Sequence, residues 1–298
     1  TGEIQSSFSV EGYSVKVLTF ADPKEDIIYT KVESPLLKIG RLSFQLDFPF
    51  PSQQFLDEGV TNAFPEKHKS YLSDSAPRQL VFQHQIDSLQ YPVAIQANQL
   101  IQVQQLSTHM YEIKVNHSAQ IELAVGFGEV IMGDFNAARL QGREKWKEYW
   151  NKGGMIDLGQ VKDQRAKELE RRMVLSMYLA KIQSTSEEPP QETGLVYNSW
   201  FGRPHLEMTW WHLMHFAYWN KGEYLEKVLP WYERNFKEAK ALAQRQGLRG
   251  VRWQKMTDPD GGESPSSVGS FLLWQQPHII DMLHELSKRK PKSFQYKY

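Results

Sequence analysis

The spacing of apolar residues changes near residue 136, and this change constrains the fold more than any other feature of the sequence. Before it, apolar and polar residues alternate with a period of two, as in a half-buried strand, for example at Leu42, Phe44, Leu46 and Phe48. Turn sequences separate further strand candidates: Ser7–Val10, Ser14–Phe20, Ile27–Val32, Gln79–Ile86, Val93–Ala97, Leu100–Leu106, Met110–Val115 and Ile121–Val125. We expect residues 1–135 to form an antiparallel β-sandwich. The polar stretch Pro49–Arg78 is expected to be a long irregular loop.

After residue 136 the period is about 3.6, which is typical of helices. A connecting helix is expected over Gln160–Gln183, and Pro189-Pro190 ends it. Three helix candidates follow, separated between the second and third by a loop at Gly247–Ser266: Leu206–Trp219, Gly222–Arg245 and Ser267–Leu286. The sequence therefore predicts a multidomain α+β protein with a β-sandwich domain at 1–135, a linker with a long helix at 136–195, and helical hairpins at 196–298.

Composition excludes several classes of protein. The chain has 298 residues, with 35 Lys+Arg against 35 Asp+Glu, and a zero net charge without a basic block argues against nucleic-acid binding. The absence of Cys excludes disulfide scaffolds and thiol enzymes. No apolar run approaches the roughly 20 residues of a membrane-spanning helix. The absence of Cys does not decide the compartment; we expect a periplasmic or secreted protein and keep the cytoplasm open.

All nine Trp residues lie after residue 145, and the densest aromatic segment is Asn198–His215. Glu207 and Trp211 are four residues apart and share a helix face, with Trp210 beside them. An aromatic ring can cover the apolar face of a pyranose while a carboxylate accepts its hydroxyls, so this pattern indicates a sugar site. An aromatic core helix capped by a salt bridge is the alternative, and the pattern alone favours that alternative slightly. A zinc site at His205, His212 and His215 is disfavoured, since the metalloprotease pattern is absent.

Two further segments are candidates for binding. The loop 250–266 combines Arg252, Trp253 and Lys255 with the acid Glu263, although a solvated connection is an equal alternative. It lacks the ligand spacing of a calcium loop. In Trp274–His278, either Gln276 and His278 point into a cavity, or a helix simply begins at Pro277. Phosphate-loop, dinucleotide and serine-hydrolase motifs are absent.

The order of sandwich, linker helix and helical hairpins resembles that of bacterial six-hairpin glycosidases of the glycoside hydrolase family 65 and family 95 type. The likeness covers about 160–285 and is carried by these segments: Pro189–Leu195, Asn198–Trp200, His205–His215, Gly250–Trp253, Gly262-Glu263 and Trp274–His278. The resemblance implies an N-terminal β-sandwich joined to an (α/α)6 barrel. Where the family pattern has Pro-Trp after the Arg-aromatic pair, this chain has Gln254-Lys255.

The resemblance implies inverting hydrolysis of a glycosidic bond in an oligosaccharide or glycoside, in which an acid protonates the leaving oxygen and a base activates water. Glu207 and Glu263 are the expected sugar-facing carboxylates: they are the candidates for catalytic residues, and both are expected to bind the substrate. The expected substrate-binding residues are His205, Trp210, Trp211, His212, Arg252, Trp253, Lys255, Gln276 and His278. We expect no metal or other cofactor, no nucleic acid and no membrane partner.

The helix candidates supply only part of such a barrel, so the chain resembles an internal portion or a reduced form of a longer enzyme. Its general acid is expected outside the chain. A non-catalytic carbohydrate-binding or structural relative and an inverting glycoside phosphorylase are the alternatives.

Overall fold

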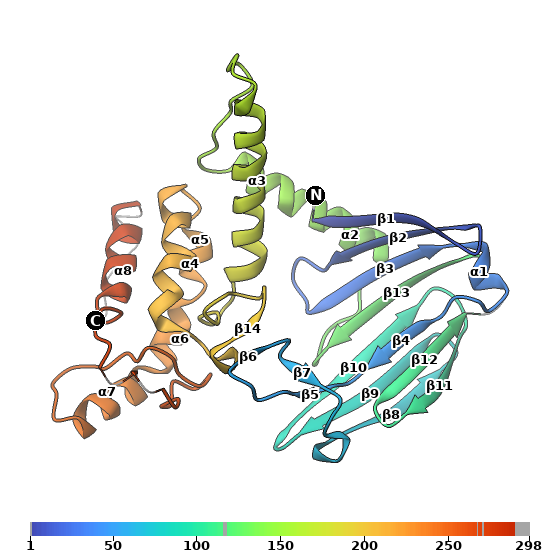
Figure 1. The fold of residues 1–298 in the computed structure, drawn as a ribbon, viewed down its shortest axis with the longest axis horizontal. Helices are drawn as coiled ribbons and strands as arrows, with labels where there is room; N and C mark the ends of the chain where they lie inside the picture. The colour runs from blue at the N-terminus through green and yellow to red at the C-terminus, as the bar shows by residue number, and fades with distance from the viewer. Residues whose placement is uncertain (1, 116–117, 267, 270, 290–298) are drawn as a thin grey trace. The chain divides into compact units, whose positions relative to one another are not determined.

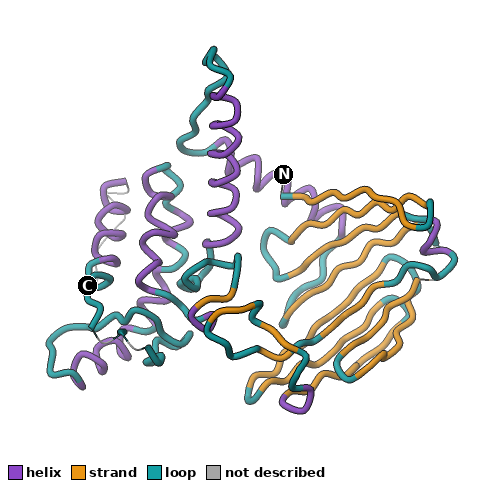
Figure 2. The backbone as a smooth tube through the Cα atoms, in the orientation of Figure 1, coloured by secondary structure: helices purple, strands orange, loops and turns teal. Residues whose placement is uncertain are grey.

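The computed structural model describes residues 2–115, 118–266, 268–269 and 271–289. Its contacts divide the chain into two compact units. The sheet unit comprises Thr1–Pro51 and Val60–Asn151, and the helical unit comprises Ser52–Gly59 and Lys152–Tyr298. Figure 1 labels the elements of both units, and Figure 2 separates strands from helices by colour.

The sheet unit contains two main antiparallel sheets (Figure 1). The larger has seven strands in the order β1 Glu3–Val10, β2 Tyr13–Ala21, β3 Ile27–Glu33, β13 Gln120–Phe127, β10 Leu89–Ala97, β9 Gln79–Ile86 and β8 His68–Ala76. The smaller has three strands in the order β11 Ile101–Ser107, β12 Met110–Val115 and β4 Phe44–Asp47. A short ladder pairs β5 Phe50–Pro51 with β7 Val60–Thr61.

The two sheets share one hydrophobic core, as in a sandwich. Along β9, Leu80, Phe82 and His84 are buried and alternate with more exposed residues, because side chains of a strand point to opposite faces. Tyr111 and Ile113 of β12 belong to the same cluster, and the rings of Phe82 and Tyr111 lie 4.7 Å apart. The mixed α+β class with a large antiparallel sheet region is thus present. Each predicted strand segment overlaps a strand of these sheets, although Leu42, Phe48 and Leu100 lie just outside the strands.

The expectation of an irregular loop over Pro49–Arg78 is wrong. Besides short ladders, this stretch contains a 3-10 turn at Pro65–Lys67 and the strand β8, which forms an edge of the larger sheet. Most β8 side chains are exposed or half-buried, so the strand shows little apolar alternation. Its pairing depends on backbone hydrogen bonds with β9, which hydropathy does not report.

Helices in the sheet unit are α1 Pro35–Lys38 and α2 Phe135–Asn151. Those of the helical unit are α3 Arg165–Ser184, α4 Leu206–Tyr218, α5 Glu223–Glu226, α6 Leu229–Arg234, α7 Phe236–Arg245 and α8 His278–Arg289. The helices predicted at Gln160–Gln183 and Leu206–Trp219 correspond to α3 and α4. In the described part of the chain, no helix has both the length and the apolar character needed to span a membrane.

Two helix predictions need correction. Gly222–Arg245 is not one helix but α5, α6 and α7, since Pro230 occupies the first turn of α6 and Asn235 lies between α6 and α7. The helix expected over Ser267–Leu286 begins only at His278. Residues 267 and 270 lie outside the described residues. Pro277 disfavours the α conformation of the residue before it, which explains the late start.

Candidate functional site

The N-terminal turn of α4 is where two of the predicted clusters meet. His205 pairs with Met256 in an antiparallel bridge, and the backbone N–H of Glu207 donates to the Lys255 carbonyl at 3.1 Å. The N–H of Thr257 donates to the Pro204 carbonyl at 3.0 Å. The segment after Arg252 therefore lies along the start of α4 and brings Lys255 to Glu207.

The Glu207 carboxylate is the centre of a largely buried group of titratable side chains, called the charged group below. Its Oε2 lies 3.4 Å from His205 Nε2 and 3.6 Å from Lys255 Nζ. His205 is fully buried and Lys255 is 7% exposed, so both are largely removed from water. Burial lowers the pKa of His205, and the Lys255 charge acts in the same direction against the hydrogen bond to Glu207. We therefore describe His205 as a neutral ring whose Nε2–H donates to Glu207.

Glu192 is a member of this group that the site predictions missed. Its Oε2 lies 3.9 Å from His205 Nε2. That oxygen is buried, and it has no hydrogen-bond partner among the described residues. Burial raises the pKa of Glu192, the nearby Glu207 charge raises it further, and Lys255 opposes both. The signal available in the sequence was its place in Pro189–Leu195, a segment noted only for its family resemblance.

The third predicted cluster joins the same region through Trp253. The backbone N–H of Trp253 donates to Gln276 Oε1 at 3.0 Å, and the Gln276 amide donates back to the Trp253 carbonyl. His278 Nδ1 lies 3.4 Å from the Leu206 carbonyl. Burial lowers the pKa of His278. Gln276 thus fixes the backbone of the Arg252–Lys255 segment, and His278 lies beside the start of α4.

The predicted aromatic residues have different environments. Trp211 is 62% exposed and lies edge-to-face against Trp210, with 4.9 Å between the rings. Trp210 Nε1 donates to Asp281 at 2.7 Å. Trp253 is buried, and its ring lies 5.0 Å from that of Tyr232, as expected for a core aromatic residue. Of the three, Trp211 offers the most open ring face.

Arg252 is buried and His212 is half-buried, and both side chains have structural partners. The His212 ring bonds to the backbone of Glu192, and burial lowers its pKa. Arg252 is 3% exposed, and its Nη2 donates to the Gly269 carbonyl at 3.4 Å. Burial also lowers the Arg252 pKa. His212 therefore links α4 to the segment that carries Glu192.

Glu263 is not part of the charged group. Its carboxylate is 52% exposed and lies 3.6 Å from Arg245 Nη2, while its backbone pairs with Thr257. Asp258 in the same loop accepts backbone N–H groups from Asp260 and Gly262, which closes a tight turn. Within the ranges that the structure describes, no group of three or more His, Cys, Asp or Glu is arranged to hold a metal ion.

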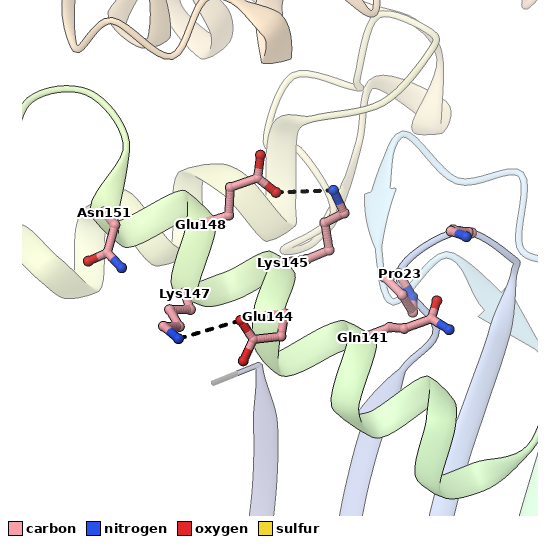
Figure 3. Close-up of a pocket in the computed structure, with 8 residues that line it drawn as sticks. Pro23, Gln141, Glu144, Lys145, Lys147, Glu148 and Asn151 are labelled. Carbon is pink, nitrogen blue, oxygen red and sulfur yellow. Dashed lines mark hydrogen bonds and ion pairs between the residues drawn. The ribbon is translucent and has the colours of Figure 1, made fainter.

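A separate hollow of about 550 Å³ lies on the sheet unit, over α2 (Figure 3). Lysine and glutamate side chains of α2 line it, and Lys145 and Glu148 pair at 3.1 Å. Both side chains of this pair are well exposed, as is usual for ion pairs on a solvated helix face. None of the predicted site residues lines this hollow.

The chain matches no protein-family model, and no curated protein matches it. Among solved structures it is similar to a bacterial glucoamylase in complex with acarbose, with 10% sequence identity and a TM-score of 0.56. The alignment covers 97% of this chain and 48% of the glucoamylase chain, so this chain spans about half the length of that structure. At this identity the likeness concerns the fold alone.

Proposed function

We propose that this chain is a glycoside hydrolase-like protein that binds an oligosaccharide at the group formed by Glu207, His205 and Lys255. The observation that carries the proposal is the Glu207 carboxylate, held between His205 at 3.4 Å and Lys255 at 3.6 Å in a largely buried position. The likeness in fold to a glucoamylase complexed with acarbose supports a carbohydrate ligand.

The chemistry of the group fits sugar hydroxyls. A carboxylate accepts hydrogen bonds from two neighbouring hydroxyls, while an ammonium group donates to a third. Trp211 lies one helical turn after Glu207 and supplies an exposed ring for the apolar face of a pyranose. Glu207 therefore orients the sugar, with the proposed reaction being inverting hydrolysis at the adjacent anomeric carbon.

We propose Glu263 as the second sugar-facing carboxylate, because its side chain is 52% exposed. An inverting site needs a protonated acid and a base about 6.5–9.5 Å apart. We propose that a residue outside this chain supplies the acid. Turnover of an oligosaccharide by Glu263→Gln tests this role, and unchanged turnover removes Glu263 from the site.

The test is a calorimetric titration of the protein with acarbose and with malto-, cello- and xylo-oligosaccharides of two and four residues. Glu207→Gln keeps the shape and removes the charge, so we expect affinity to fall about tenfold to a hundredfold, because hydrogen bonds to charged groups contribute about 1.5–3 kcal/mol. Glu238→Gln is the control for Glu263→Gln, since both glutamates lie near Arg245. Wild-type affinity in Glu207→Gln, or no binding to any member of the panel, overturns the proposal.

A non-catalytic sugar-binding protein is the second candidate. The two partners of the Glu207 carboxylate, the His205 ring and the Lys255 ammonium group, favour it. A carboxylate that accepts from His205 and lies beside the Lys255 ammonium group suits hydroxyl recognition better than proton donation. Sugar release measured with and without phosphate separates the cases. Binding without release supports the binding protein, release in buffer supports the hydrolase, and release only with phosphate supports a phosphorylase.

A further inference from the structure

Three aromatic side chains that no site prediction included form a cluster in the helical unit. The rings of Phe55 and Trp200 lie 4.7 Å apart, and those of Phe55 and Phe201 lie 5.6 Å apart. The backbone N–H of Phe201 also donates to the Phe55 carbonyl at 3.3 Å. Phe55 is brought there by the segment Ser52–Gly59, which belongs to the helical unit by its contacts.

The segment is anchored by Asp57. Its strand β6 Leu56–Asp57 pairs with β14 Asn198–Ser199. Asp57 Oδ1 accepts from the Ser52 hydroxyl at 2.9 Å and from the Gly59 backbone N–H at 2.7 Å. The Asn198 amide donates to the same oxygen at 3.1 Å. These bonds hold Phe55 against the residues that follow Asn198.

The backbone under the cluster is strained. Trp200 has φ 47° and Phe201 has φ 60°, in the left-handed region that side chains with a Cβ avoid. Such residues persist where the surrounding structure fixes them, and they gather at functional sites. Core packing does not require this arrangement, because Phe55 and Phe201 are 46% and 44% exposed.

The cluster is continuous with the charged group around Glu207. Lys255 Nζ lies 5.0 Å from the centre of the Trp200 ring, within the range of a cation–π contact. The rings of Trp200 and His205 are 5.9 Å apart and nearly perpendicular. Trp200 therefore contacts Phe55 and also lies beside two partners of the Glu207 carboxylate.

We infer that Phe55, Trp200 and Phe201 form an aromatic wall that binds the second or a later sugar unit of an oligosaccharide whose first unit is held at Glu207. The inference rests on the proposed function. Exposed ring faces match the apolar C–H faces of pyranose units, and the adjacent ion group matches their hydroxyls. The wall therefore contributes to recognition of chain length rather than to the chemical step.

The test compares the disaccharide and the tetrasaccharide of whichever panel series the wild type binds, by calorimetric titration. In Phe55→Ala and Phe201→Ala, we expect tetrasaccharide affinity to fall about tenfold, the upper range for one aromatic contact, with disaccharide affinity changed less than about twofold. Leu56→Ala is the matched control, because Leu56 is an exposed apolar residue of the same segment. The control is expected to bind both ligands as the wild type does.

Three other outcomes overturn the inference, and the first two are distinguishable from failure of the proposed function. If the wild type binds and both Phe variants bind the two ligands unchanged, or lose affinity for both equally, the wall is not a separate sugar contact. If the variants instead abolish self-association of the wild type in sedimentation, the surface contacts a second copy of the chain. If the wild type binds no panel member, the proposed function and this inference fail together.

Discussion

Three buried histidines of the sheet unit, His68, His84 and His109, pack against one another. His68 Nδ1 lies 3.0 Å from His84 Nε2, and His84 Nδ1 lies 2.8 Å from the Tyr91 hydroxyl. The rings of His68 and His109 stack at 3.8 Å. Burial lowers the pKa of His84 to about 4, and the positive charges that His68 and His109 would carry lower it further. Folding therefore holds His84 in its neutral form.

This residue predicts acid sensitivity. Folded His84 binds a proton less readily than the unfolded chain, whose histidine pKa is about 6.5, so its stabilising effect is present above that pH. It is lost as pH falls from about 6.5 to about 4, which corresponds to roughly 3 kcal/mol at about 1.36 kcal/mol per pKa unit. Urea unfolding at pH 7, 5.5 and 4.5 measures the effect.

The His84 contribution is isolated by difference, because carboxylates titrate in the same range. In His84→Gln the fall in unfolding free energy between pH 7 and 4.5 is expected to be smaller than in the wild type. His284→Gln, at an exposed position of α8, is the control for replacing a histidine by glutamine. An identical pH slope in His84→Gln and the wild type contradicts the prediction.

Removing the charge of Glu192 and removing that of Glu207 are expected to have opposite effects on the stability of the helical unit. Burial and Glu207 raise the pKa of folded Glu192, so its ionised form opposes folding at neutral pH and the penalty disappears as pH falls through the unfolded pKa. Glu192→Gln should stabilise the helical unit at pH 7 but not at pH 3.5. Glu207→Gln should destabilise it by about 1–3 kcal/mol, since Lys255 loses a buried partner. Urea unfolding followed by tryptophan fluorescence measures both effects. Destabilisation by Glu192→Gln at pH 7 would contradict the prediction for Glu192.

At the level of elements, apolar periodicity predicted long helices and central strands well. The prediction Leu206–Trp219 matches α4 to within one residue, because the buried residues of α4 repeat at the helical period. Periodicity could not locate the breaks at Pro230 and Asn235, since apolar residues continue through them. It also missed β8, an edge strand with few buried residues.

The candidate site was predictable only in its parts. The three sequence clusters meet because backbone pairing of His205 with Met256 and the side chain of Gln276 join distant segments, and hydropathy contains no signal for either contact. Glu192 follows a proline pair outside any helix, and Phe55 lies in a strand-rich region. Neither residue shares a periodic pattern with Glu207.

The connection between α2 and α3 gives a prediction at this scale. Gly153 has φ +77°, and an added Cβ would lie 2.3 Å from the Trp219 carbonyl oxygen at the end of α4. Gly154 donates to that same oxygen at 2.7 Å. Gly153→Ala combines left-handed strain of about 1–2 kcal/mol with a backbone overlap. We expect it to lower the unfolding free energy by more than about 2 kcal/mol, measured by urea unfolding.

Gly247→Ala is the matched control for this substitution. Gly247 has φ +71°, and its added Cβ would meet nothing within 4 Å, so only the conformational strain applies. Its expected cost is about 1 kcal/mol. Equal losses in the two variants would mean that the Trp219 contact adds nothing, contrary to the prediction.

At the scale of the whole molecule, the sheet unit has its own hydrophobic core, and we expect its unfolding to be separable from that of the helical unit. Phe82 is fully buried in the core of the sheet unit, so Phe82→Ala should destabilise that unit by about 3–5 kcal/mol. Seven of the nine Trp residues lie in the helical unit, so Trp fluorescence reports mainly its unfolding. Calorimetry should show one transition shifting while the fluorescence transition stays; a common shift contradicts independent units.

The assignment of Ser52–Gly59 to the helical unit means that the covalent chain passes from one unit to the other after Pro51, after Gly59 and again after Asn151. A gene fragment beginning at Lys152 would encode every helix of the helical unit but would lack Phe55 and Asp57. Dissection at a single boundary thus produces an incomplete polypeptide, and a recombinant helical unit requires the excised segment to be reattached through a new linker.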